Sequence, residues 1–411
     1  MLCRLRIRKP HLAVVALLMA LALANHASAD SAFDRFLESM WPRAQKIGVT
    51  RPVFDAAIKG LTPDFSLPDL EIAGRPEKPA PGQPEFVQTP SQYLREKSFD
   101  RLAARGQQLQ KRYRDTLARI EKEIGVPGNI VLAIWARETD YGGYKLPHDG
   151  IRALATQAYT GRRKAMYQEE FIHALKMLQD GVPRSDMRSS WGGALGLTQF
   201  LPSDYYRYAV DFDHDGRIDI FHSVPDALAS AARQLAGRGW QRGERWAYEV
   251  RAPENGDCSA GVPEVKMPVG EWVKRGYLII PPRKLTAEAL ATPASLLQPE
   301  GSYGPSFLTP KNYFVIKDYN FSDLYVLFVG HLADRIAGAK SFVTPWSKSE
   351  QLKTRDVEAM QQRLTELGLY KDKIDGKAGM LTRAALGHYQ KRNGLKVDCW
   401  PTAAVLSHMR R

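Results

Sequence analysis

An acidic side chain, Glu138, lies near the end of an apolar segment, residues 125–143, whose residue spacing predicts a helix. Ile130, Ile134 and Glu138 fall four residues apart, so the carboxyl group shares the apolar face of that helix. Desolvation and the negative end of the helix dipole both disfavour its ionised form. Glu138 is therefore a candidate general acid that could donate a proton near neutral pH. The alternative is a structural ion pair, with Arg137 or with a more distant basic side chain.

A second candidate site lies in residues 190–202, where three glycines and two aromatic residues accompany Gln199. Glycines allow the backbone to lie close against a ligand, and the amide of Gln199 could orient that ligand. A tight contact between helices would use the same composition. Upstream of this segment, Arg162 and Arg163 could bind a carboxylate or an acetamido oxygen, although adjacent arginines are more often surface charge.

Residues 211–219 carry aspartates at loop positions one, three, five and nine and a glycine at position six, which resembles a calcium-binding loop. The twelfth position is His222, where an EF-hand has glutamate, so the loop departs from that motif. The candidate ligands are Asp211, Asp213, Asp215, the carbonyl group of Arg217, and Asp226 as the replacement for the missing glutamate. A metal-free acidic turn neutralised by Arg217 is the alternative.

Residues 1–29 have the composition of a secretory signal peptide. Basic residues precede an apolar run, and a pattern of small residues ends at Ala29. The run is shorter than the roughly 20 apolar residues that a transmembrane helix needs, and no cysteine follows it at a position that could carry a lipid. We therefore expect a soluble exported protein of the periplasm, without a membrane anchor.

Removal of this segment lowers the formal net charge of the 411-residue chain from +13 to +9, because it contains four basic and no acidic residues. A basic exported protein could bind nucleic acid, anionic lipid or an anionic wall polymer, and export argues against nucleic acid. Cys258 and Cys399 remain, far apart in the sequence and without the spacing of a metal site. Their positions leave open whether they pair.

The rest of the chain supplies the elements that must hold these side chains. Its length and its hydrophobic content of 44% predict two or more globular units. Short apolar runs between Pro, Gly and Asn predict a small strand-rich subdomain at residues 245–310. Helices are predicted at residues 93–123, 164–180 and 322–339, and, as a pair broken near Pro52, at residues 30–70.

The C-terminal part of the chain has the pattern of a separate small domain. Residues 346–350 form a predicted linker, and residues 351–411 form a predicted compact module of three helices. The first of these helices has apolar residues at helical spacing, namely Val357, Met360, Leu364 and Leu367. A module of about 60 residues is small for an independent domain but feasible.

Residues 30–345 resemble the membrane-bound lytic transglycosylase B family, glycoside hydrolase family 103, whose members cleave bacterial peptidoglycan. The resemblance rests on five motifs in the same order: Arg137-Glu138-Thr139, Gly161-Arg162-Arg163, residues 192–200, the aspartate loop at residues 211–219, and Tyr319-Asn320 with Tyr325. Residues 351–411 resemble the peptidoglycan-binding module, with Ile374-Asp375-Gly376 and residues 382–386 as the matching motifs. The resemblance implies a mainly α protein: a lysozyme-like α+β catalytic domain with a small strand-rich subdomain, followed by a three-helix module.

By this resemblance, Glu138 is the catalytic acid and base. The groove for the reacting sugars would be lined by Ser190, Gln199 and Phe200, the substrate would be held by Arg162 and Arg163, and the site would be closed by Tyr319 and Tyr325. The chain departs from the family at Gln234, where an aromatic residue is usual. This departure weakens the expectation of one sugar-stacking contact.

Hydrolysis of a glycosidic bond usually needs two carboxylates, but Glu138 alone stands out, because Asp140 points to a different helix face. The resemblance implies cleavage of the MurNAc-GlcNAc β-1,4 bond of glycan strands with formation of a 1,6-anhydro-MurNAc end and without consumption of water. Calcium would be structural, and no cofactor would be required for chemistry. The alternatives are a muramidase, which admits water, and a non-catalytic wall-binding protein that retains the fold.

Overall fold

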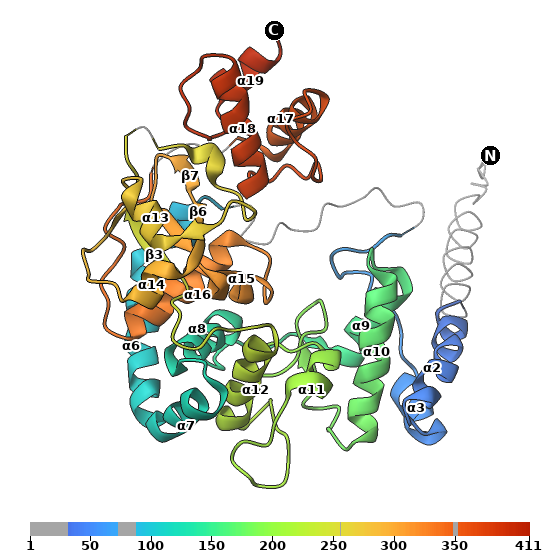
Figure 1. Ribbon diagram of the computed structural model, residues 1–411. Helices are drawn as coiled ribbons and strands as arrows, with labels where there is room; N and C mark the ends of the chain where they lie inside the picture. Colours follow the sequence, from blue (N-terminus) through green and yellow to red (C-terminus); the bar gives the residue numbers. More distant parts are fainter. Residues whose placement is uncertain (1–31, 73–87, 255, 348–351) are drawn as a thin grey trace, which may run out of the picture. The chain divides into compact units, whose positions relative to one another are not determined.

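The computed structural model describes residues 32–72, 88–254, 256–347 and 352–411 (Figure 1). The chain forms two compact units. Unit 1 contains the residues up to Pro81 together with Lys145–Arg207, and unit 2 contains Gly82–Tyr144 and Tyr208–Arg411. The predicted signal peptide and residues 348–350 of the predicted linker lie outside the described residues. Within the described ranges, no helix is long and apolar enough to cross a membrane.

Unit 1 is mainly helical, with one short pair of antiparallel strands. Its elements after residue 145 are β1 (His148–Asp149), α9 (Gly150–Thr160), α10 (Lys164–Gln179), β2 (Arg188–Ser189) and α11 (Pro202–Tyr208), which ends at the first residue of unit 2. The position of α10 confirms the helix predicted at residues 164–180.

The N-terminal part of unit 1 differs from the prediction of two helices. Its described residues, 32–72, contain three helical segments, namely residues 32–39, α2 (Trp41–Lys46) and α3 (Arg51–Ile58). Proline in the first turn of a helix costs no hydrogen bond, because the N–H it lacks has no partner within the helix. Pro42 therefore starts α2 after the turn at Met40, and Pro52 lies inside the first turn of α3.

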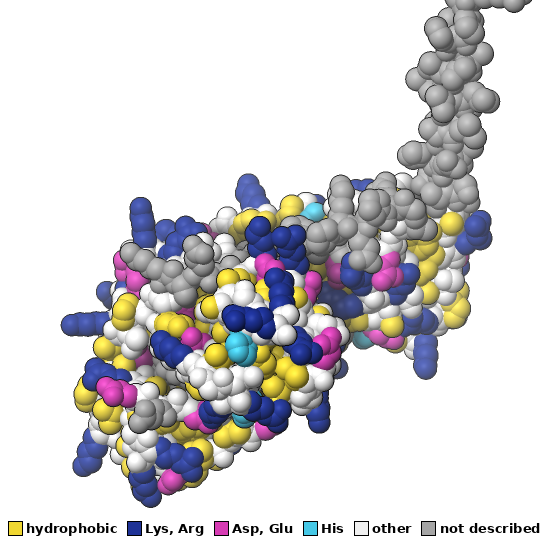
Figure 2. Space-filling view, turned by 90° about the horizontal axis from the view of Figure 1, so that it is seen from above, with side chains coloured by type: hydrophobic (Ala, Val, Ile, Leu, Met, Phe, Trp, Pro, Cys, Tyr) yellow, Lys and Arg dark blue, Asp and Glu magenta, His cyan; other side chains and the backbone are white. Residues whose placement is uncertain are grey.

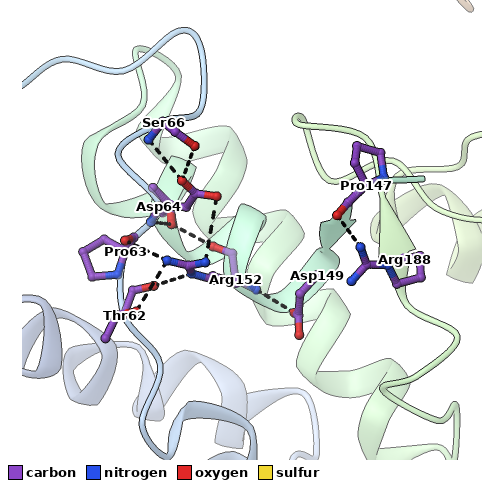
Figure 3. Close-up of polar contacts among 9 residues, drawn as sticks. Thr62, Pro63, Asp64, Ser66, Pro147, Asp149, Arg152 and Arg188 are labelled. Carbon is purple, nitrogen blue, oxygen red and sulfur yellow. Dashed lines mark hydrogen bonds and ion pairs between the residues drawn. The ribbon is translucent and has the colours of Figure 1, made fainter. Parts of the chain in front are cut away.

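Arg152 on α9 joins that helix to the chain segment that follows α3 (Figure 3). Its Nε donates a hydrogen bond to the carbonyl of Thr62 at 2.8 Å, and its Nη2 donates to the carbonyl of Pro63 at 3.3 Å. The carboxylate of Asp64 lies 4.0 Å from Nη1. The carboxylate of Asp149 caps the start of α9 by accepting the N–H of Arg152 at 3.0 Å. These contacts of Arg152 hold the segment against α9, and Leu61 and Leu67 of the same segment are buried.

Outside the strand-rich part and the C-terminal module, the described helices of unit 2 are α5 (Pro90–Tyr93), α6 (Glu96–Arg112), α7 (Arg114–Ile124), α8 (Gly128–Thr139), α12 (Val224–Gly237), α15 (Lys311–Lys317) and α16 (Asp323–Ile336). Four of them, α6, α7, α12 and α16, pack against α8, the helix that carries Glu138. The single helix predicted at residues 93–123 is thus divided into α5, α6 and α7. Tyr113 leaves helical geometry, with φ −105° and ψ 24°, so α6 and α7 run in different directions (Figure 1). Each helix can then bury its own apolar stripe.

The strand-rich part of unit 2 confirms the subdomain predicted at residues 245–310. Its described elements are β3 (Tyr248–Arg251), β4 (Met267–Pro268), α13 (Val269–Lys274), β5 (Leu278–Ile279), α14 (Ala287–Ala291), β6 (Pro293–Leu297), β7 (Pro299–Ser302) and β8 (Ser306–Thr309). An antiparallel sheet has the strand order β4-β6-β8-β3-β5. Leu308 of β8 lies opposite both Tyr248 and Leu296, and these residues share a buried apolar cluster with Trp272.

The C-terminal module comprises residues 352–411, with α17 (Thr354–Glu366), α18 (Met380–Arg392) and α19 (Ala403–Met409) in its described part. Its buried core includes Met360, Leu364 and Leu386. Leu367, predicted to belong to the apolar stripe, is instead 37% exposed, because α17 ends one residue before it.

A disulfide bond between Cys258 and Cys399 joins the strand-rich part to the C-terminal module. Around it, Lys391 pairs with Asp257, and the hydroxyl group of Tyr303 donates to Asp398 at 2.7 Å. The covalent bond resolves the question that the sequence left open. It also shows that the module is attached to the rest of unit 2 by more than the chain segment between them.

Candidate active site and candidate metal site

Glu138 lies in the last turn of α8, as the sequence predicts. The helix begins after Pro127, whose extended backbone (ψ 138°) precedes the first turn, and it ends at Asp140, which has left-handed geometry with φ 50°. Ile130 and Ile134, on the same face as Glu138, are buried. The side chain of Glu138 is half-buried. An acidic group thus stands at the end of an apolar helix, with one part of it still accessible.

The phenol group of Tyr325, on α16, donates a hydrogen bond to Oε1 of Glu138 at 2.5 Å. Tyr325 is buried, and burial together with the charge of Glu138 raises its pKa well above the usual value. The phenol therefore keeps its proton and acts as a donor toward the carboxyl group. A donor fixed in this way orients the carboxyl group and stabilises its ionised form.

Tyr319 and Arg137 complete the surroundings of this hydrogen bond. The rings of Tyr319 and Tyr325 are stacked, with centroids 6.5 Å apart and planes 8° apart. The guanidinium of Arg137 lies 6.0 Å from the centre of the Tyr325 ring, and its Nε donates to the hydroxyl of Tyr93 at 2.7 Å. The sequence named Arg137 only as an alternative ion-pair partner of Glu138. No local sequence pattern indicated that Arg137 packs against the rings of Tyr93 and Tyr325, which are 44 and 188 residues away.

Asp140, two residues after Glu138, is engaged elsewhere. Its Oδ1 pairs with Nη1 of Arg101 at 3.0 Å, on the side of α6. This pairing agrees with the prediction that the two carboxylates point to different faces. Asp140 is therefore placed to end α8 rather than to share a reaction with Glu138.

In unit 1, residues 190–200 form a compact loop closed by main-chain hydrogen bonds. The N–H of Ser190 donates to the carbonyl of Ala194 at 3.0 Å, and its Oγ accepts the N–H of Ala194 at 3.2 Å. Gln199 has φ 58°, and its Nε2 donates to the carbonyl of Gly196 at 3.1 Å. Both side chains are half-buried and hold the loop in shape.

Gly193 and Phe200 show that part of this motif serves packing inside unit 1. A Cβ atom on Gly193 would lie 2.1 Å from the side chain of Leu154, and its φ is 79°. Phe200 is 1% exposed, and its N–H and carbonyl both bond to Leu195 at 2.8 Å. The ring of Phe200 therefore supports the loop from within. The sequence predicted that this residue lines a groove, and that role stays a prediction.

Arg162 and Arg163 both face one carboxylate of unit 1. Nε of Arg162 lies 3.5 Å from Oδ1 of Asp69, and Nη2 of Arg163 lies 3.7 Å from Oδ2. Nη2 of Arg163 also donates to the hydroxyl of Tyr167 at 2.9 Å. Both guanidinium groups remain about half exposed. They stabilise the chain around Asp69 and still present positive charge at the surface.

The aspartate loop lies in unit 2, before α12. Oxygen atoms of Asp211, Asp213 and Asp226 all lie within 4.8 Å of one another. Asp226 is buried and accepts the N–H groups of Phe212 at 2.8 Å and Asp219 at 2.9 Å. Burial raises the pKa of Asp226, against the effect of these donors. The sequence-based choice of Asp226 is therefore consistent with the fold, which brings it to the loop from the next helix.

Two of the other predicted metal ligands make local contacts. The carboxylate of Asp215 accepts the N–H of Arg217 at 2.8 Å, which closes a turn. The cluster of three aspartates is instead formed by loop positions one and three and by α12. Whether Asp215 and the carbonyl of Arg217 contribute ligands stays a prediction.

The model of the transglycosylase SLT domain matches residues 32–334, and the model of a putative peptidoglycan binding domain matches residues 353–409. The chain belongs to the transglycosylase SLT domain family. The motifs around Glu138, Gln199 and Tyr325 all fall inside the first match. The mainly helical fold, with its small sheet and helical C-terminal module, confirms the fold class that the sequence predicted.

Among relatives of this SLT-domain protein, the membrane-bound lytic murein transglycosylase B of Escherichia coli (strain K12) is 30% identical over 236 residues. The match covers 56% of this chain and 62% of that protein. The crystal structure of SltB3 from Pseudomonas aeruginosa in complex with NAG-anhNAM-pentapeptide is 36% identical, with a TM-score of 0.82, and covers 92% of this chain and 99% of that chain. The Escherichia coli lytic transglycosylase Slt35 in complex with calcium is 27% identical, with a TM-score of 0.51, and covers 61% of this chain and 80% of that chain.

Proposed function

We propose that this protein is a peptidoglycan lytic transglycosylase that cleaves the MurNAc-GlcNAc β-1,4 bond of glycan strands and leaves 1,6-anhydro-MurNAc ends, in remodelling and turnover of the cell wall. The observation that carries this proposal is the hydrogen bond from Tyr325 to Glu138 at the end of an apolar helix. It supplies one oriented carboxyl group in a chain of the SLT domain family.

The orientation of this carboxyl group suggests which oxygen holds the proton. Oε1 accepts the hydrogen bond from Tyr325, so the proton of the acid form belongs on Oε2. Glu138 would transfer that proton to the glycosidic oxygen, while the acetamido oxygen of the substrate stabilises the developing cation. The carboxylate that remains is stabilised by the phenol of Tyr325. It would then remove the proton of the C6 hydroxyl, and this oxygen closes the 1,6-anhydro ring without water.

The remaining site residues have proposed roles in binding the sugar chain. Ser190, Gln199 and Phe200 would form one wall of the groove, with Phe200 acting through its support of the loop. Arg162 and Arg163 would hold polar groups of the substrate with the part of each guanidinium that stays exposed. Tyr319, stacked on Tyr325, would close the site near Glu138.

The proposed organisation follows the two family matches. Residues 30–345 would form the catalytic domain, residues 346–350 a linker, and residues 351–411 the peptidoglycan-binding domain. Residues 1–29 would direct export, and the protein would act in the periplasm, where its polymer lies. A peptidoglycan-binding domain raises the local concentration of the substrate at the catalytic domain.

We also propose that the aspartate loop binds a calcium ion. Three converging carboxylates, one of them buried, repel one another unless a cation offsets their charge, and calcium prefers such oxygen ligands. Asp211, Asp213 and Asp226 would hold the ion, with Asp215 and the carbonyl of Arg217 as further ligands. The ion would stabilise the loop, and the chemistry at Glu138 does not require it. A relative, Slt35 of Escherichia coli, has been solved in complex with calcium.

Substitution of Glu138 tests the proposed reaction. Glu138→Gln keeps the size of the side chain but cannot donate a proton, so cleavage of purified peptidoglycan should fall at least ~100-fold. The matched control is Asp140→Asn, which removes a carboxylate two residues away that pairs with Arg101, and it should keep most of the activity. Activity of Glu138→Gln within a few-fold of the original protein, with both variants folded, would reject the assignment.

A further inference from the structure

A cleft of about 520 Å³ lies in unit 2 between the C-terminal module and the residues that precede α16. Its size falls within the roughly 300 to 1,000 Å³ that is typical of sites for small ligands. Neither Glu138 nor the aspartate loop lines it. Its lining includes Pro263, Pro299, Phe321, Lys373, Arg383 and Trp400.

The wall contributed by the module is a rigid loop. The side chain of Gln361, which is buried, accepts the N–H groups of Asp375 at 3.0 Å and Gly376 at 2.8 Å. Its Nε2 donates to the carbonyl of Lys377 at 3.1 Å. The hydroxyl of Tyr370 donates to the carbonyl of Lys373 at 2.8 Å. The loop at residues 372–377 is therefore preorganised, and its charged side chains are exposed.

The opposite wall is tied to the module by charge and by a covalent bond. Asp323, at the start of α16, accepts from Nζ of Lys317 at 2.5 Å and from Nη2 of Arg383 of the module at 3.3 Å. Trp400 directly follows Cys399, which is bonded to Cys258. The two walls are thus fixed to each other at two points, so the cleft exists before any ligand arrives.

The aromatic residues Phe321 and Trp400 line the cleft. Phe321 is 77% exposed, more than any other large hydrophobic side chain in the described part of the chain. Trp400 is 4% exposed, and its indole N–H has no hydrogen-bond partner within the described part of the chain, although buried indoles usually find one. Together with Pro263 and Pro299, they give the cleft an apolar floor beside a charged loop.

We propose that this cleft binds the peptide stem of peptidoglycan, as a second binding site apart from the catalytic residues. Sugar rings are uncharged, whereas a peptide stem brings carboxylates, an amine and the methyl groups of alanine. The module wall alternates Asp372, Lys373 and Asp375, which suits a ligand with both signs of charge. Phe321 and the proline rings suit the alanine methyl groups. Basic, acidic and apolar side chains are also mixed over the face in Figure 2. The proposal of a peptide ligand therefore does not rest on a surface of one charge.

The choice of a peptide stem as the ligand rests on the proposed function, because it presumes that the protein acts on peptidoglycan. Its test is a binding measurement with the full-length protein and a synthetic stem tetrapeptide that contains no sugar. Such a peptide has no glycosidic bond, so the result does not depend on the role of Glu138. Isothermal titration calorimetry of the original protein, Lys373→Glu and Phe321→Ala would give the three affinities.

A matched control comes from the same module. Lys396 is exposed, lies against Tyr303, and does not line the cleft, so Lys396→Glu makes the same change of charge elsewhere. We expect Lys373→Glu and Phe321→Ala each to weaken binding of the peptide about 10-fold, which corresponds to the loss of one charged hydrogen bond or one buried aromatic contact. Lys396→Glu should leave the affinity within about twofold.

Three outcomes would overturn the proposal. The first is no binding of the peptide at millimolar concentration, and the second is equal affinities for Lys373→Glu and Lys396→Glu. The third is binding of glycan strands whose peptides have been removed, with a loss in Lys373→Glu, because this result would assign the cleft to the sugar chain. Both substituted side chains are exposed, so unchanged thermal melting would show that the variants are folded.

Discussion

Replacement of Arg383 by Met tests how the C-terminal module is joined to the helix that carries Tyr325. Arg383 belongs to the module and is 9% exposed, and its partner Asp323, the first residue of α16, is 12% exposed. Burial alone would raise the pKa of Asp323, but the charges of Lys317 and Arg383 hold it at about 2. Met has a similar length and no charge, so the change removes the interaction with little loss of volume.

The magnitude follows from the pKa and from the number of partners. The usual pKa of an aspartate is 3.8, and one pKa unit corresponds to ~1.4 kcal/mol, so burial and the partners of Asp323 together give a net stabilisation of about 2–3 kcal/mol at pH values above 3.8. Removal of one partner of a buried pair can cost ~3–5 kcal/mol. Because Lys317 and the hydroxyl of Tyr313 still contact Asp323, we expect Arg383→Met to lower the free energy of unfolding by about 2 kcal/mol.

The assay is urea unfolding at neutral pH under conditions that keep the disulfide intact. The control is Arg363→Met, an exposed arginine of the same module that pairs with Glu366, and its loss should change the free energy by less than ~0.5 kcal/mol. The stabilisation by Asp323 should be present above pH ~4 and should disappear as the pH falls through about 2, because its pKa is lowered in the folded state. Equal unfolding curves for Arg383→Met and Arg363→Met would refute this reasoning.

Three further predictions concern the metal, the disulfide and the tyrosine. Removal of calcium by a chelator should lower the melting temperature of the original protein and have little effect on Asp226→Asn, and an unchanged melt after verified metal removal would reject the site. Reduction of the bond between Cys258 and Cys399, which spans 141 residues, should lower the free energy of unfolding by ~2–5 kcal/mol in denaturant titrations, and coincident curves would show that the bond is not stabilising. Tyr325→Phe should lower kcat about 10-fold to 100-fold on soluble glycan fragments, because it removes a hydrogen bond to the charged Glu138, and an unchanged kcat would show that this bond is not used.

The sequence predicted those features that depend on local pattern. Three such patterns predicted elements that the structure has. The apolar spacing before Glu138 predicted α8, and the glycine after Gln179 and Asp180 predicted the end of α10. The short apolar runs in residues 245–310 predicted the strand-rich part. Breaks between helices were harder to predict from the sequence. The break at Tyr113 has no proline or glycine, because it is set by how α6 and α7 pack rather than by a local signal.

Long-range partners could not be predicted from one sequence. The disulfide partner of Cys258, the ion pair between Asp323 and Arg383, and the hydrogen bond from Tyr325 to Glu138 join residues that are 60 to 187 positions apart. Local residue spacing carries no information about partners that are distant in the sequence. Only the family resemblance linked Tyr325 to Glu138. The burial of the Phe200 ring inside unit 1 likewise had no local signal, and its predicted role in a groove stays a prediction.

In the proposed reaction, Glu138 works with the substrate's own C6 hydroxyl in place of water. This hydroxyl is held in the same sugar as the reacting carbon, and well-oriented intramolecular groups can reach effective molarities of ~10⁵ M or more, far above that of bulk water. Mass spectrometry of fresh digests of purified peptidoglycan measures the product directly. We predict fragments that end in 1,6-anhydro-MurNAc and that are one water, about 18 mass units, lighter than hydrolysis products. Digests dominated by hydrated reducing ends would contradict this mechanism and identify a muramidase.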